Sequence, residues 1–111
     1  MTQVDDALLN RMVKAIVDEV DPEQVILFGS QARGDAGADS DVDLVVVEAE
    51  PFGPNRDRRA EAARLWRALS GIAVAVDILV YSRDELDYWR DSLNNVLARA
   101  LREGRVIYER H

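Results

Sequence analysis

Three short, mainly apolar runs stand in the middle of this 111-residue chain, at residues 25–28, 42–47 and 73–80. Each is bounded by turn residues and is shorter than an ordinary helix, as is typical of buried strands. Around these runs, apolar residues recur at helical spacing, first over residues 4–20. Strands that alternate with helices in so short a chain predict a small mixed sheet flanked by helices, an α+β domain of the α/β type.

Capping residues mark the ends of the expected helices. Asn55 can cap the start of one helix and Gly71 can end it, while Ser82 and Glu85 form a capping box at the start of another. We expect helices over residues 2–20, 55–71 and 82–104, the last of which could be broken near Asp91-Ser92, and a last edge strand over residues 106–108. A chain of this length buries roughly two-thirds of its unfolded surface, which is enough for one core. We therefore predict a single domain over residues 1–111.

Composition excludes several classes of function. The chain has no cysteine, so disulfides and thiolate metal sites are excluded. It carries 21 acids and 14 bases, and this net charge of -7 argues against direct binding to a nucleic-acid backbone. No apolar stretch approaches the roughly 20 residues of a membrane span, and the first residues lack a signal-peptide pattern. We therefore expect a cytoplasmic protein that does not bind membranes.

Charge is unevenly distributed along the chain. Between Gly34 and Asn55 there are six acids and no base, and five arginines then follow between Arg56 and Arg67. Thirteen of the fourteen bases are arginine. We attribute this preference for arginine to a compositional bias of the genome.

Carboxylates stand at positions where the pattern predicts apolar residues. Asp41 and Asp43 are two residues apart at the start of one strand, so they project from the same face. Asp77 interrupts a second apolar run, and we interpret it as a buried acid that needs a partner. At about 4 Å and an effective dielectric near 20, each pair of like charges costs about 4 kcal/mol. The three acids therefore require neighbouring cations or bound protons.

Two kinds of cation could meet this requirement. Arginine pairing remains open, although no arginine lies near the acids in sequence. Hard divalent cations bind oxygen ligands of this type, and Mg²⁺ usually does so through a few carboxylates and the phosphates of a substrate. An EF-hand calcium loop is a poorer match, because its sixth position requires glycine and holds Leu44. Taken singly, Asp41 or Asp43 is equally compatible with a solvated loop residue, and it is the combination that favours a magnesium site.

A glycine and a serine follow the first predicted strand directly. We expect Gly29-Ser30 to connect the strand to a short helical segment. This connection would direct free backbone N–H groups and a hydroxyl at one point. This arrangement suits a phosphate, but the same pair is also an ordinary strand-to-helix turn with Ser30 as the N-cap. The position of the pair upstream of the acids favours the interpretation as a phosphate site.

Ten residues separate Ser30 from Asp41. This spacing, with a third acid on a later strand, resembles the nucleotidyltransferases of the DNA polymerase β superfamily. More closely, the chain looks like the minimal nucleotidyltransferases, small proteins that often act as antitoxins to HEPN-domain toxins. The segments that carry the resemblance are residues 27–34 (LFGSQARG), 40–44 (SDVDL) and 101–108 (LREGRVIY).

The resemblance implies a role for each motif residue. Asp41 and Asp43 would hold two Mg²⁺ ions, and Asp77 would share one of them and help to deprotonate the acceptor hydroxyl. Gly29 and Ser30 would hold the β- and γ-phosphates of ATP. Arg33 is placed to neutralise part of the triphosphate, although its position is explained equally well by an arginine in a surface loop. The chain departs from the family at Gln31, where relatives often carry a basic residue.

The acceptor implied by the resemblance is a tyrosine of the partner toxin, which would receive AMP and lose its ribonuclease activity. A non-catalytic antitoxin that neutralises the toxin by contact is the alternative. Transfer to a small molecule such as an aminoglycoside is disfavoured, because 111 residues leave no room for an acceptor-binding domain. Exposed aromatic residues could form the partner interface, from the set Trp66, Tyr81, Tyr88 and Trp89, although helical spacing favours the core for the two tryptophans.

Overall fold

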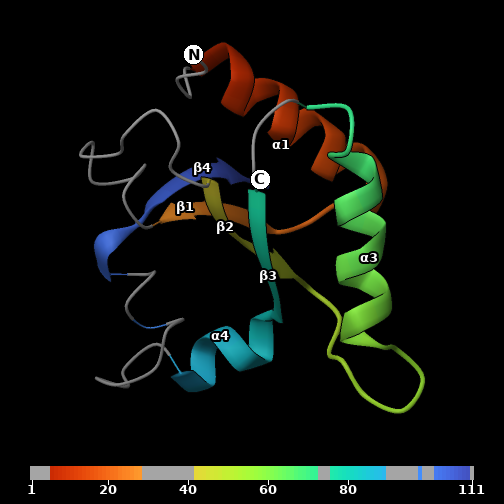
Figure 1. The fold of residues 1–111 in the computed structure, drawn as a ribbon. Coiled ribbons are helices and arrows are strands. Elements are labelled where there is room, and N and C mark those ends of the chain that lie inside the picture. The colour runs from red at the N-terminus through yellow and green to blue at the C-terminus, as the bar shows by residue number, and fades with distance from the viewer. Residues whose placement is uncertain (1–5, 29–41, 73–75, 90–97, 99–101, 111) are drawn as a thin grey trace.

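The computed structural model describes residues 6–28, 42–72, 76–89, 98 and 102–110 (Figure 1). Its helices are α1 (Asp6–Val20), α3 (Arg58–Ala68) and α4 (Arg83–Trp89), and its strands are β1 (Gln24–Phe28), β2 (Val42–Glu48), β3 (Val76–Ser82) and β4 (Arg105–Glu109). Each predicted strand is confirmed to within a few residues over the described part of the chain. The predictions for Gly29, Ser30, Arg33 and Asp41 lie outside the described residues.

The four strands form one mixed sheet in the order β3-β2-β1-β4. Strand β1 is antiparallel to both β2 and β4, whereas β2 and β3 run parallel. A parallel pair needs a crossover connection, and α3 supplies it between β2 and β3. The predicted α+β domain with a small mixed sheet is confirmed.

Alternation along the strands divides the core into two layers. Leu44 and Val46 of β2 lie in one layer with apolar residues from α1 and α3, such as Met12 and Leu65. Val45, from the other face of β2, packs in a second layer with Leu86 of α4 and others. Helices α1 and α3 therefore cover one face of the sheet, and α4 packs against the other (Figure 1). Among the described residues, no helix is long and apolar enough to span a membrane.

Capping explains where the helices begin. Ser82 and Glu85 form the predicted capping box: the Glu85 carboxylate accepts from Ser82 N–H at 3.0 Å, and the Ser82 hydroxyl accepts from Glu85 N–H at 3.3 Å. The predicted cap at Asn55 is wrong. Gly53 and Arg56 exchange two backbone hydrogen bonds across a tight turn that contains Asn55, so α3 begins after Asp57 instead.

Asp57 is expected to stabilise the start of α3. Its side chain accepts a hydrogen bond of 2.9 Å from Arg59 N–H, which would otherwise lack a partner within the helix. Asp57→Ala should lower the free energy of unfolding by about 1 kcal/mol, measured by urea denaturation. Asn55→Ala is the matched control and should change stability little. A larger loss of stability in Asn55→Ala than in Asp57→Ala would place the cap at Asn55.

Candidate active site

Two of the three predicted acids are neighbours in the sheet. In the parallel pairing of β2 with β3, Asp43 lies directly opposite Asp77. Adjacent strands are about 4.8 Å apart, and paired residues project from the same face. Phe28, the last residue of β1, pairs with Asp43 from the other side. The structure therefore brings two carboxylates together although 34 positions separate them in the sequence.

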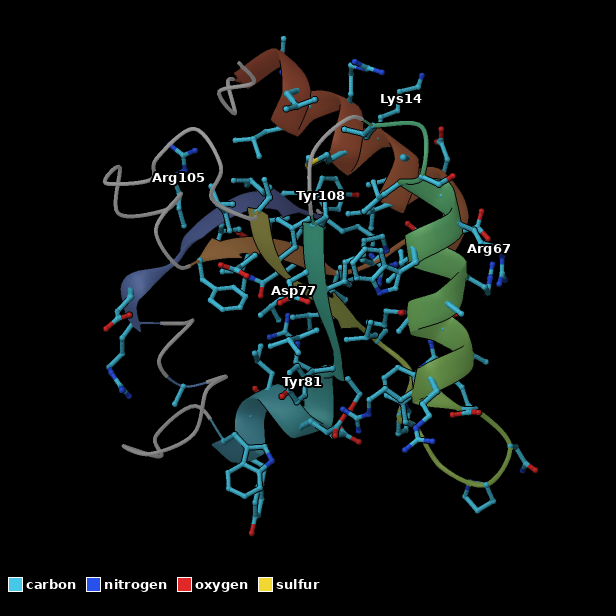
Figure 2. All side chains as sticks on the ribbon, in the orientation of Figure 1. Lys14, Arg67, Asp77, Tyr81, Arg105 and Tyr108 are labelled. Carbon is cyan, nitrogen blue, oxygen red and sulfur yellow. The ribbon has the colours of Figure 1, made fainter. Side chains whose placement is uncertain are left out.

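Asp77 is exposed, whereas the adjacent residues Val76 and Ile78 are buried. Figure 2 shows Asp77 and Tyr81 along the same strand, with Tyr81 towards the α4 end. The interpretation of Asp77 as a buried acid is wrong, because β3 is an edge strand and Asp77 lies on its solvent-accessible face. In water the repulsion between two carboxylates at about 4 Å is closer to 1 kcal/mol, which a small domain can tolerate.

The carboxylate pair fits a divalent cation. Its donors are hard oxygen atoms on adjacent strands, and Mg²⁺ is commonly bound by one or two carboxylates together with substrate phosphates. Within the ranges that the structure describes, no group of three acids or histidines is placed to hold a metal ion. Asp41, the third predicted ligand, lies outside those ranges. The metal-binding role of all three acids stays a prediction.

The phosphate-binding prediction concerns the same end of the sheet. Strand β1 ends at Phe28, beside Asp43, and Gly29 and Ser30 are the next residues in the chain. In the sequence, the segment predicted to bind phosphate therefore begins directly after Phe28, the residue that pairs with Asp43. The roles of Gly29, Ser30 and Arg33 stay predictions.

The two tryptophans that were predicted to lie in the core are exposed, and so is Tyr88. Trp66 on α3 has 46% of its surface accessible, and on α4 the values are 75% for Tyr88 and 37% for Trp89. The rings of Tyr88 and Trp89 meet edge to face, with centroids 4.7 Å apart. The prediction that both tryptophans lie in the core is wrong, because Leu65 supplies the buried face of α3 and Leu86 that of α4 instead.

A buried polar cluster that the sequence patterns did not predict lies at the end of β2 remote from Asp43. Glu48 is only 4% exposed, and its carboxylate accepts a hydrogen bond of 2.5 Å from Arg56, which also donates to Glu61 at 2.9 Å. Burial, with the nearby Glu61 carboxylate, raises the pKa of Glu48 to about 8. A hydrogen bond from Glu48 lowers the pKa of Glu61. The pair therefore shares one proton at neutral pH.

The uneven charge distribution was the sequence signal for this cluster. Of the five arginines between residues 56 and 67, Arg56 and Arg64 pair with acids on other elements, and Arg58 pairs with Glu85. Arg58 also donates to the carbonyl of Val80 on the edge strand. Three of these arginines thus have specific contacts in the fold, whatever the compositional bias.

Comparisons with known proteins add a family match and several similar folds. The family model described as "Nucleotidyltransferase domain" matches residues 9–81. No curated protein matches the chain.

Three solved structures illustrate the fold similarity. A toxin–antitoxin structure with AMP-PNP has a chain 24% identical to this one, with a TM-score of 0.58, covering 92% of this chain and 73% of that one. A candidate nucleotidyltransferase from Sulfolobus solfataricus is 22% identical, with a TM-score of 0.56 and coverages of 99% and 94%. A complex of tri-AMPylated Shewanella oneidensis HEPN toxin with MNT antitoxin gives 20% identity, a TM-score of 0.52 and coverages of 94% and 71%. These similarities establish the fold.

Proposed function

The chain belongs to the nucleotidyltransferase domain family, and from this premise we propose that it transfers AMP from ATP to a hydroxyl group of a partner protein. The observation that carries the proposal is the pairing of Asp43 with Asp77 across β2 and β3. The strand register holds the two carboxylates side by side, with Asp77 exposed, and this supports a role for them as the acidic half of a metal–triphosphate site.

The proposed site divides its tasks among the motif residues. Asp41, Asp43 and Asp77 would hold Mg²⁺, which supplies stabilisation of the charge that develops on the phosphoryl oxygens. Gly29 and Ser30 would bind the β- and γ-phosphates through backbone N–H groups and a hydroxyl. Asp77, as an exposed carboxylate, can accept the proton of an incoming hydroxyl. The acceptor oxygen forms a bond to the α-phosphorus, and the bond to the leaving pyrophosphate breaks.

The proposed partner is a HEPN-domain toxin. Complexes of similar fold contain a toxin with its antitoxin, and in one of them the HEPN toxin is tri-AMPylated. On this chain, Tyr88 and Trp89 form an exposed aromatic pair on α4. Exposed aromatic side chains of this kind are frequent energetic centres of protein interfaces. The same surface also favours the alternative, a domain that neutralises its partner by contact alone.

Transfer of label distinguishes the two functions. The chain is incubated with α-labelled ATP, Mg²⁺ and a HEPN-domain toxin, and the proteins are separated. Enzymatic transfer predicts label on the toxin, absent when the label is on the γ-phosphate, because pyrophosphate leaves. Neutralisation of the toxin without any label on it would support binding alone.

Binding of nucleotide should be visible as stabilisation. A ligand that binds only the folded state raises its stability, so Mg²⁺ with a non-hydrolysable ATP analogue should raise the melting temperature. At about ten times the dissociation constant the rise should be roughly 5 °C for a domain of this size. Mg²⁺ alone and the analogue with EDTA are the controls. The absence of a shift at millimolar ligand would contradict the nucleotide site.

A further inference from the structure

Strand β3 is an edge strand of the sheet, and α4 continues from its end (Figure 1). The outer side of an edge strand carries backbone N–H and C=O groups that no neighbouring strand pairs. Near α4, side chains bind two of these groups. The Val80 carbonyl accepts a hydrogen bond of 3.0 Å from Arg58, and Ser82 N–H donates to the Glu85 carboxylate at 3.0 Å. This half of the edge is therefore closed to another strand.

The other half of the edge is open and lies beside Asp77. Val80 and Ser82 direct their backbone groups outwards, and the direction alternates along a strand, so those of Ile78 also point outwards. Asp77 and Leu79 bond to β2 instead. Within the described residues, no hydrogen bond joins the backbone of Ile78 to a group outside the sheet. An incoming strand would therefore find its first free partner at Ile78.

A groove of about 170 Å³ lies between this edge and the start of α3. Residues 78–81 of β3 line it together with Arg58, Arg59 and Ala62. Small-molecule sites usually exceed about 300 Å³, so this groove suits one side chain of a peptide better than a free ligand. Arg58 is paired with Glu85, whereas Arg59 is exposed and has no ion pair in the described part of the chain. The groove therefore favours a side chain that carries negative charge.

A strand added at this edge would extend a row of side chains that already crosses the sheet. Phe28, Asp43 and Asp77 are paired neighbours on three strands. A residue of an added strand opposite Asp77 would lie about 5 Å away and project from the same face. We propose, as an extension of the proposed AMP transfer, that the acceptor protein pairs an extended segment with the outer edge of β3. The hydroxyl that receives AMP then lies opposite Asp77.

The position of Arg59 adds a second requirement for this segment. Arg59 lines the groove together with Val80, three positions along β3 from Asp77. Val80 belongs to the core layer that α3 covers, on the opposite face of β3 from Asp77. A residue three positions from the hydroxyl likewise projects from the opposite face of the added strand, towards α3. The acceptor segment should therefore carry an aspartate or glutamate three positions from its hydroxyl residue.

Amide hydrogen exchange resolved by residue tests the added strand. The full chain is measured with Mg²⁺ and a non-hydrolysable ATP analogue, with and without a HEPN-domain toxin. Ile78 N–H should exchange about tenfold more slowly in the complex, the effect of one additional hydrogen bond. Asp77 and Leu79 N–H already bond to β2 and should change less. Unchanged exchange at Ile78, or equal slowing at all three residues, would overturn the proposal.

Arg59→Glu tests the acidic contact. Reversal replaces an attraction with a repulsion of similar size, so the KM for the toxin should rise about tenfold while kcat changes little. A glutamate in the first turn of α3 is favourable for the helix, so folding should be intact. Arg11→Glu makes the same change at an exposed position on α1 outside the groove and should keep the parental KM. An unchanged KM in Arg59→Glu would contradict the acidic contact.

Failure of the added strand can be distinguished from failure of the proposed transfer. Both variants should keep the rise in melting temperature caused by Mg²⁺ and the ATP analogue, because neither residue belongs to the nucleotide site. If the parent chain places no label on the toxin, the transfer is rejected and the added strand with it. If label is transferred but Ile78 exchanges as in the free chain, only the added strand is rejected.

Discussion

Asp43→Asn is expected to lower the rate of AMP transfer by at least about a hundredfold, the usual effect of removing one preorganised electrostatic contact to a transition state. Asparagine keeps the size of the side chain and removes its charge. Asp77→Asn should cause a similar loss, because Asp77 lies opposite Asp43 in the sheet. The measurement is the initial rate of label transfer from α-labelled ATP to the partner protein.

Stability measurements distinguish a loss of catalysis from a loss of folding in these variants. Asp77 is exposed, and removing one of two neighbouring like charges relieves repulsion, so Asp77→Asn should be no less stable than the parent by urea denaturation. Glu103→Gln, which removes an exposed charge elsewhere, should transfer AMP at the parental rate. Loss of activity with intact folding would assign the acids to the chemistry. Transfer at the parental rate in Asp43→Asn would reject the proposed metal site.

The position of this site depends on a register that the sequence alone does not determine. Short apolar runs bounded by turn residues predicted both β2 and β3, and Asp43 and Asp77 fall on these strands. Their pairing depends on the parallel alignment of two strands that α3 separates in the chain. A slip of two residues would keep every apolar side chain in its layer and would still separate the carboxylates. Local patterns therefore predicted the ligands, while tertiary packing decides whether they meet.

The exposure of Asp77 could not be predicted for a related reason. The residues of β3 between its buried positions include the apolar, partly buried Leu79, so the strand looks wholly apolar in sequence and Asp77 looks like an intrusion into a core. The position of β3 at the edge of the sheet is a property of the whole fold and cannot be inferred from its local sequence. The capping box at Ser82 and Glu85 was predictable because both of its hydrogen bonds join residues three positions apart.

Glu48 shows the limit of local patterns most clearly. A glutamate at the end of an apolar run looks like the first residue of a loop, and only the fold brings Arg56 and Glu61 to it. The turn between Gly53 and Arg56 returns the chain towards β2, and the first turns of α3 then present Glu61. The resulting pair of acids, one protonated and one ionised, gives the fold a pH-dependent stability.

The free energy of unfolding should fall as pH rises from about 5 to about 8. In the unfolded chain Glu48 ionises near its ordinary pKa of 4.5, whereas in the folded chain its pKa is about 8. Between these values the folded state binds more protons than the unfolded state, so stability decreases with increasing pH. The loss should be of the order of 4 kcal/mol, because each unit of pKa difference corresponds to about 1.4 kcal/mol. The lowered pKa of Glu61 adds no slope in this range, because Glu61 is ionised in both the folded and the unfolded chain.

Two matched substitutions locate this effect in the pair. Glu48→Gln replaces a protonated acid with a neutral amide that can still donate to Glu61, so the decline with pH should flatten. Glu61→Gln makes the same chemical change in an ionised acid that accepts from Arg56 and Arg64, so it should destabilise the fold near pH 7 by about 2 kcal/mol. Urea denaturation at several pH values measures both. If the free energy of unfolding fell with pH as steeply in Glu48→Gln as in the parent, groups other than this pair would carry the pH dependence. The two substitutions should differ because Glu48 holds the shared proton and Glu61 is ionised.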